Sequence, residues 1–273
     1  MHKKSMIAAS LSALIICLAA CKGPAAPADS LPIIPTQGQP ASSATIPLDT
    51  TVPETTAPTL PPETKPPHSP LYIEGLDVED VIKYFNEVSL DAEFANSGNA
   101  KLVQKWMEPI CYRLHGAPTD KDLEVLNTFA TWLNTIDGFP GISEAKDTQI
   151  ANLQIHFCTE KEMISLMGEQ FAGNDGAVTF WYWDNVIGDA IICYRTDLNQ
   201  YVRNSVILEE IYNGLGPIQD TQLRTDSIIY SGYSEPQQLT HIDELILKLL
   251  YHPDIKCGMD ASECEAVIRQ LYY

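Results

Sequence analysis

Residues 208–220 read Leu-Glu-Glu-Ile-Tyr-Asn-Gly-Leu-Gly-Pro-Ile-Gln-Asp, a helix that carries two adjacent glutamates and ends in a glycine-rich turn. Three later segments are read together with it: Ser227-Ile-Ile-Tyr230, Leu239-Thr-His-Ile-Asp243 and Leu249-Leu-Tyr251. Glycine commonly ends a helix, and a threonine followed three residues later by an acid begins one. The succession therefore predicts a helix that stops near Gly216, a loop, and a second capped helix that ends in the Leu-Leu-Tyr run.

This succession resembles the second half of a metzincin metallopeptidase of the matrixin sort. There, H-E-x-x-H-x-x-G-x-x-H is followed by a Ser-x-Met-Tyr turn and by a helix opened with Leu-Ser-x-x-Asp. The resemblance places Glu210 on the general-base glutamate and Gly216 on the glycine that ends the helix. The histidine ligands of zinc are replaced by Glu209, Asn213 and Gln219, and the methionine of the turn is replaced by Ile229.

These replacements argue against a zinc enzyme. A catalytic zinc ion takes three imidazole or carboxylate ligands at about 2.0–2.2 Å and keeps one open position. Amide oxygens suit calcium or magnesium better. Without a metal-activated water, Glu210 has no hydroxide to generate. We expect no metal and no other cofactor; the alternative is a hydrolase that uses Glu210 with an unusual metal held through Glu209, Gln219 or Asp220.

A closer resemblance is to an uncharacterised bacterial family, domain-of-unknown-function family 2927, over about residues 80–260. In that family the helix usually reads Glu-Glu-x-x-Gln and the loop Asn-Asp, so Asn213 and Gln219 keep an amide and change its length. The resemblance implies a fold and a location, and it supplies no reaction. The residues that carry it are Glu93-Phe94, Lys105-Trp106, Glu209-Glu210, Leu215-Gly216, Asp220, Ser227-Ile228, Leu239-Thr240, Asp243, Leu250-Tyr251 and Gly258-Met259.

Six polar residues are candidates for binding a ligand. Neighbours on a helix lie about 100° apart, so the two adjacent glutamates cannot both point into one pocket. The alternative is that both simply face solvent, and that the tyrosine of the turn belongs to the core. The candidates are Glu209, Glu210, Asn213, Gln219, Asp220 and Tyr230.

The first 20 residues have the features of a secretory leader. Two lysines precede an apolar run over residues 6–20, which is shorter than the roughly 20 residues of a bilayer span and suits a signal peptide. The run closes with Leu18-Ala19-Ala20-Cys21, which resembles a bacterial lipobox. The resemblance implies cleavage before Cys21, acyl chains on that residue, and anchoring on the outer side of the cytoplasmic membrane. A plain signal peptide followed by a chance cysteine is the alternative.

Residues 22–70 hold 13 of the 19 prolines and no aromatic residue. Such a segment cannot bury enough apolar surface to offset its ordering entropy, so we expect a disordered linker. The predicted organisation is a leader over residues 1–20, a lipidated cysteine with its linker over residues 21–70, and a globular domain over residues 71–273.

The globular part is expected to be one α/β (α+β) domain of metzincin-like architecture, with helices packed on a mixed sheet. Strands are predicted over 105–115, 150–157, 177–183 and 189–194, with a turn at 184–188. Helices are predicted from 77 to about 85, over 119–138, from Thr159 with Glu162 as its capping box, over 201–216, over 240–251 and over 262–271.

The cysteines and histidines allow two further interpretations. Cys257 and Cys264 are candidates for a disulfide in an exported protein. Three other cysteines lie in predicted strands, where a bridge is possible if two of the strands are neighbours. A thiol hydrolase would pair Cys111 with His115, or Cys158 with His156, but no helix N-terminus is predicted there to favour a thiolate. The three strand cysteines are Cys111, Cys158 and Cys193.

The aromatic run Phe180-Trp181-Tyr182-Trp183 has two interpretations. As a covered strand it packs in the core. As an edge strand beside a cleft it binds an extended peptide or a glycan, by strand addition or by stacking.

Composition narrows the function further. The chain has 273 residues, 45% of them hydrophobic, and a net charge of −19, which excludes a nucleic-acid binder that works through basic patches. The domain is too short for the two lobes of a solute-binding lipoprotein. We expect a surface lipoprotein with a non-catalytic domain that binds a peptide, a cell-wall component or a protein partner.

Overall fold

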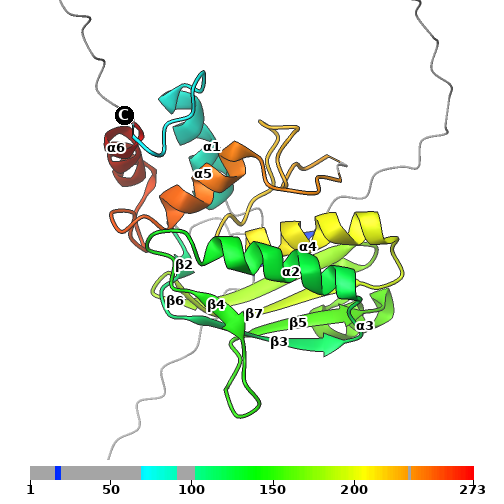
Figure 1. Ribbon diagram of the computed structural model, residues 1–273. Helices are drawn as coiled ribbons and strands as arrows, with labels where there is room; N and C mark the ends of the chain where they lie inside the picture. The colour runs from blue at the N-terminus through cyan, green and yellow to red at the C-terminus, as the bar shows by residue number, and fades with distance from the viewer. Residues whose placement is uncertain (1–15, 20–68, 91–101, 233–234) are drawn as a thin grey trace, which may run out of the picture. The chain divides into compact units, whose positions relative to one another are not determined.

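A seven-stranded mixed sheet organises the part of the chain that the computed structural model describes, which is residues 16–19, 69–90, 102–232 and 235–273 (Figure 1). The strand order is β1-β6-β7-β5-β3-β4, and β2 pairs separately with β7. The strands are β1 (Ile16–Ala19), β2 (Lys105–Trp106), β3 (Ile110–Gly116), β4 (Ile142–Glu144), β5 (Leu153–Cys158), β6 (Gly176–Trp183) and β7 (Val186–Arg195).

The sheet is mostly parallel. β3 pairs in parallel with β4 and β5, and β7 pairs in parallel with β5 and β2. β6 is antiparallel to both of its neighbours, β7 and β1. The predicted α/β class with a mixed sheet is therefore confirmed.

Six helices accompany the sheet in the described residues. α2 and α4 lie side by side across one face of it, while α1, α5 and α6 gather beyond one end (Figure 1). None of the helices in this part of the chain is both long and apolar enough to span a bilayer. The helices are α1 (Val78–Leu90), α2 (Asp120–Leu133), α3 (Glu160–Met167), α4 (Gln200–Gly214), α5 (His241–Leu250) and α6 (Ala261–Tyr272), with a 3₁₀ turn at Glu169–Phe171.

Local signals set the helix starts. Both predicted capping boxes form: Thr159 exchanges hydrogen bonds with Glu162 ahead of α3, and Thr240 does so with Asp243 ahead of α5. Each box satisfies amide groups that would otherwise lack partners at a helix start. These predictions needed only residues three positions apart.

The predicted strand over 105–115 is wrong, because two strands with different partners occupy it. β2 ends at Trp106 and pairs with β7, and β3 begins at Ile110 and pairs with β4 and β5. Pro109 lies between them and has no N–H for a sheet hydrogen bond. The short strand β4 was not predicted.

The connection between β6 and β7 is also tighter than predicted. It consists of Asp184 and Asn185, whose φ angles are 51° and 64°. Positive φ at both positions is the type I′ hairpin turn that matches strand twist, and Asp and Asn tolerate it. Gly188, which suggested a longer turn, lies inside β7.

β1 lies within the segment predicted to be a leader. Its backbone pairs antiparallel with β6, with Ile16 opposite Phe180 and Ala19 opposite Ala177. The lipidation site Cys21 and all but the last two residues of the linker predicted over residues 22–70 lie outside the described residues. The prediction of a lipidated, membrane-anchored chain therefore stays a prediction.

Candidate functional site

α4 carries the candidate site and is buried around nearly its whole circumference. Asn199 caps its first turn by accepting a hydrogen bond from the Val202 amide at 3.1 Å. Arg203, one turn into the helix, forms a buried ion pair with Asp122 of α2 and also donates to the Thr196 carbonyl. The helix is thus anchored at its start before it reaches the two glutamates.

Three contacts fix the end of α4. The Trp106 indole donates to the Gly214 carbonyl at 2.9 Å, and the Tyr251 hydroxyl donates to the Leu215 carbonyl at 2.8 Å. Gly216 has a φ of 126°, and a Cβ there would lie 2.5 Å from the Gln104 carbonyl oxygen. Only glycine fits this close approach. Several residues that carry the family resemblance therefore act by holding this helix end in place.

Lys105 also helps to fix the helix ends in this region. Its buried ammonium donates to the carbonyls of Leu250 at 2.7 Å and Ile255 at 2.5 Å, which satisfies the end of α5. Burial lowers the pKa of Lys105 to about 8. β2, only two residues long, thus ties the ends of α4 and α5 together through its two side chains.

The loop after α4 is anchored to α1. The backbone amide of Gln219 donates to the Val88 carbonyl at 3.2 Å. Glu87 accepts from the Thr221 hydroxyl at 2.6 Å and from the Gln222 amide at 3.1 Å. These bonds hold the loop against the end of α1.

The turn at 227–230 rests on a buried polar network. The Ser227 hydroxyl donates to Asp243 at 2.7 Å and contacts the Tyr84 hydroxyl at 2.7 Å. Asp243 also accepts from Tyr84 at 3.1 Å and from the Ile228 amide at 3.2 Å. Burial, reinforced by Asp243, raises the pKa of Tyr84. Ile229, in the methionine position of the resemblance, is fully buried, so this turn is structural.

Glu210 is the exceptional residue of the site. Its side chain is only 1% exposed, yet neither carboxyl oxygen has a hydrogen-bond partner among the described residues. Burial, reinforced by the charges of Glu209 and Asp220, raises the pKa of Glu210 well above its ordinary value of 4.5. Buried polar groups in folded proteins nearly always have partners, so an unpartnered carboxyl needs an explanation.

Glu209 and Asp220 accompany Glu210. Glu209 precedes Glu210 on the same helix and is half-buried, whereas Asp220 is buried. Burial, Asp220 and then Asp175 raise the pKa of Glu209 well above its ordinary value. Asp175 was not predicted; the Asn-Asp-Gly run at 174–176, a turn signal directly before β6, was the only hint.

The other three candidate residues differ in their surroundings. Asn213, one turn after Glu209, is 2% exposed, and its Oδ1 has no partner in the described part of the chain. The side-chain amide of the half-buried Gln219 donates to the Asp220 carbonyl at 3.3 Å. Tyr230 packs its ring against Gly232 beside the structural turn. The structure therefore brings Glu209, Glu210 and Asp220 into one electrostatic group.

In the described part of the chain, both oxygens of Glu210 and the Oδ1 of Asn213 are buried without a hydrogen-bond donor. Among the described residues, no three His, Cys, Asp or Glu side chains are arranged to hold a metal ion. Burial raises the pKa of Glu210 and so favours its protonated form, which can donate one hydrogen bond and accept another. The arrangement thus suits recognition of a donor on a ligand.

The thiol-hydrolase arrangement does not form. The imidazoles of His115 and His156 stack on each other with centroids 4.3 Å apart, and His115 contacts the Gln154 side chain at 2.8 Å. The Cys111 sulfur accepts from the Gln149 amide at 2.7 Å. The thiols of Cys158 and Cys193, on the neighbouring strands β5 and β7, interact with each other.

The predicted disulfide between Cys257 and Cys264 is absent from the structure, where both are free thiols. The Cys257 sulfur lies 3.8 Å from the Lys105 carbonyl, while Cys264 is buried on the inner face of α6. Burial raises the pKa of Cys257, and it raises that of Cys264 to about 12. Each of the two sulfurs therefore has neighbours of its own, and they are not joined in a disulfide.

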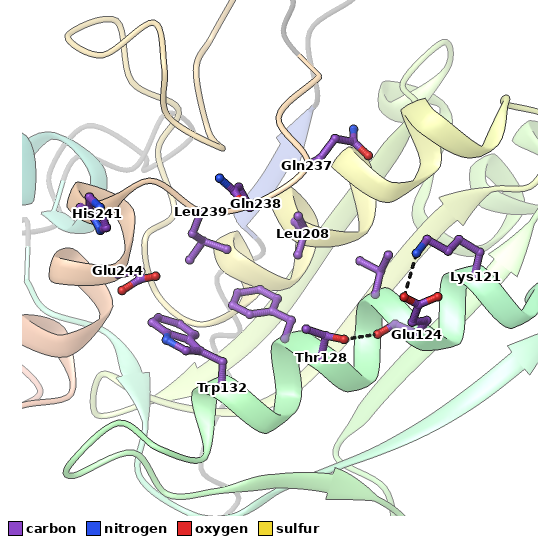
Figure 2. Close-up of a pocket in the computed structure, with 12 residues that line it drawn as sticks. Lys121, Glu124, Thr128, Trp132, Leu208, Gln237, Gln238, Leu239, His241 and Glu244 are labelled. Atoms are coloured by element: carbon purple, nitrogen blue, oxygen red, sulfur yellow. Dashed lines mark hydrogen bonds and ion pairs between the residues drawn. The ribbon is translucent and has the colours of Figure 1, made fainter.

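A separate hollow of about 500 Å³ lies between α2, α4 and the start of α5 (Figure 2). Leu208 and Leu239 point into it, with Trp132 at one end and His241 on the rim (Figure 2). Its charged rim residues pair with neighbours: Glu124 with Lys121 at 2.9 Å, and Glu244 with Lys248 at 3.0 Å. None of the six predicted site residues lines this hollow.

The fold and the site together define an α/β domain whose helix α4 carries a buried carboxyl, Glu210, without a hydrogen-bond partner in the described part of the chain. Residues 78–270 match the family described as "Protein of unknown function (DUF2927)", and the chain belongs to that family. The match confirms the family resemblance seen in the sequence. No curated protein and no solved structure matches the chain.

Proposed function

We propose that this domain binds an extended peptide along the edge of β6 without cleaving it. The observation that carries the proposal is the antiparallel pairing of β1 with β6, from Ile16 opposite Phe180 to Ala19 opposite Ala177. β1 belongs to the segment that the sequence predicts to be removed as a leader. Its removal leaves a row of unpaired N–H and C=O groups on β6, which is a template for an added strand.

The aromatic run lies on this edge strand and supports the same interpretation. Phe180 is buried in the core, Trp181 and Tyr182 are half-buried, and Trp183 is 58% exposed. A peptide longer than four residues would meet these rings beyond Phe180. Aromatic side chains that are partly exposed supply large contact areas at interfaces.

A metzincin-like scaffold without zinc accommodates this role. The element order from β3 through α2, the later strands, α4, the turn at 227–230 and α5 follows the order of the resemblance. On the resemblance, Glu210 keeps the general-base position but has no metal-activated water to act on. The scaffold therefore retains a peptide-binding edge while the chemistry of hydrolysis lacks its electrophile.

The proposal also places the domain at the surface of a membrane. Lipid on Cys21 would anchor the chain on the outer side of the cytoplasmic membrane, and the proline-rich linker would extend at about 3.1 Å per residue. The peptide would then belong to a protein or to a cell-wall partner within reach of that linker.

A binding assay tests the proposal. The protein is the chain from residue 21 onward with Cys21→Ser, and the probe is a fluorescent peptide with the sequence of residues 13–20 and Cys17→Ser. We expect saturable binding by fluorescence anisotropy. Absence of binding by this peptide, and by a panel of unrelated extended peptides, would contradict the proposal.

Backbone N-methylation of the probe supplies the control. In an antiparallel pair, alternate residues direct their N–H groups toward the partner strand. Methylating one alternating set should abolish binding, whereas methylating the other set should leave it intact. Cleavage of the peptide in the presence of added Zn²⁺, Ca²⁺ or Mg²⁺, lost in Glu210→Gln, would favour the hydrolase alternative.

A further inference from the structure

The register of β1 on β6 predicts where a bound side chain would point. Ala19 lies opposite Ala177, so a peptide bound in this register would place its next residue opposite Gly176. Residues directly opposite each other in an antiparallel pair share one face of the sheet. The peptide residue at that position would therefore face the same way as Gly176.

Gly176 faces Glu210. A Cβ on Gly176 would lie 2.8 Å from both Cγ and Oε1 of Glu210, and 2.5 Å from a methyl carbon of Val206. The carboxyl thus occupies the space where a side chain at 176 would begin. A peptide residue opposite this glycine is directed toward the same carboxyl, with no intervening side chain from β6.

The buried polar atoms without partners in this region are oxygens that can accept hydrogen bonds. Both oxygens of Glu210 and the Oδ1 of Asn213 are buried and lack partners among the described residues. After burial, Glu209 and Asp220 are the neighbours that raise the pKa of Glu210, so these surroundings favour a positive charge beside it. An unmatched set of acceptors with negative charge calls for a cationic donor.

A second carboxyl on the same face of the sheet shows the contrast. Asp122 of α2 is fully buried and is matched by Arg203 of α4. The chain therefore supplies its own cation to one buried carboxyl, whereas the described residues supply none to the other.

We propose that the peptide residue opposite Gly176 carries a basic side chain, whose ammonium or guanidinium group binds the carboxyl of Glu210. This inference rests on the proposed peptide-binding function. It adds the chemical class of the ligand and the position of the selective residue.

The proposal implies a proton release. In the free domain, burial and the neighbouring acids raise the pKa of Glu210. A bound cation stabilises the ionised form. Binding of a lysine-containing peptide should therefore release up to one proton, whereas an uncharged peptide of the same shape should release none.

The test compares lysine with norleucine, its uncharged analogue of nearly equal length. The host peptide carries the sequence Leu-Ile-Ile-Ser-Leu-Ala, and the guest residue follows the final alanine. We expect lysine at the guest position to bind about tenfold or more tighter than norleucine. Lysine placed one position earlier, where the side chain faces the opposite side of the sheet, should gain less than about threefold.

Two variants of the processed chain complete the design. Glu210→Gln should abolish the preference for lysine, and a cooperative unfolding transition reports that the variant folds. Asp254→Asn, an exposed acid on a distant loop, is the control for net charge and should keep the preference. Titration calorimetry in buffers with different ionisation enthalpies should detect the proton.

The outcomes separate the two proposals. Equal binding of the lysine and norleucine peptides, or a preference for lysine that survives Glu210→Gln, overturns the basic subsite while peptide binding stands. Failure of both peptides to bind overturns the peptide-binding function itself, and the subsite with it.

Discussion

Two buried carboxyl groups, Asp243 on α5 and Glu210 on α4, have opposite surroundings. Asp243 accepts hydrogen bonds from Ser227, Tyr84 and the Ile228 amide, in addition to its capping contacts with Thr240. Glu210 has no partner for either oxygen among the described residues. The resemblance to metzincins covers both positions, yet only Asp243 has partners that tie it into the fold among the described residues.

The largest expected effect comes from breaking the satisfied site. Asp243→Ala removes the acceptor shared by Ser227 and Tyr84 and leaves their buried hydroxyls without it. Each buried group left unpaired costs about 1–3 kcal/mol, so we expect a loss of about 4 kcal/mol in the free energy of unfolding. Urea unfolding measures it. The neighbouring Glu244→Gln, on a half-buried side chain, should change the value by less than about 0.5 kcal/mol.

Breaking the ion pair between Arg203 and Asp122 should cause the second-largest loss in the free energy of unfolding. Arg203→Met leaves the fully buried Asp122 without its cation, which typically costs about 3 kcal/mol. Adding Asp122→Leu to that variant should recover most of the loss, since two apolar groups replace a buried pair. Additive losses in the double variant would show that Asp122 does not depend on Arg203.

Replacing Glu210 should have the smallest effect on the free energy of unfolding, and the effect should have the opposite sign. Glu210→Gln removes a buried carboxyl without partners in the described part of the chain, so the free energy of unfolding should stay equal or rise by about 1–2 kcal/mol near neutral pH. A loss of more than about 2 kcal/mol would mean that Glu210 has a structural partner, and the comparison with Asp243 would fail.

The pH dependence of that difference follows from the raised pKa of Glu210. In the folded protein this pKa lies above its ordinary value of 4.5. Between the two values only the unfolded chain loses the proton, so the wild-type protein loses stability relative to Glu210→Gln as the pH rises. The loss should be about 1.4 kcal/mol for each pH unit in that window. Below pH 4.5 the difference should be constant. Unfolding curves for both proteins from about pH 4 to about pH 8 measure it.

Short-range features of this fold could be predicted from the sequence. The capping boxes of α3 and α5 depend on residues three positions apart, and both predictions are confirmed. The polar helix end at 209–213 followed from its motif. The α/β class followed from alternating strand and helix patterns.

Features set by distant residues could not be predicted. Glu210 packs closely against Gly176 of β6, and Arg203 pairs with Asp122, 81 residues earlier. The split between β2 and β3 depends on which strands each one meets. The local pattern of hydrophobic residues does not indicate which distant residues come into contact, because tertiary contacts override local propensity.

β1 also bears on when the edge of β6 becomes available. A segment carried on the same chain competes with an outside peptide at an effective concentration that the length of the connection sets. On the proposed function, the precursor is therefore its own inhibitor, and only peptides of high affinity would displace residues 16–19. Cleavage of the leader would then be the activating step as well as the maturation step, so that the exposed strand first meets competitors after the chain has been processed.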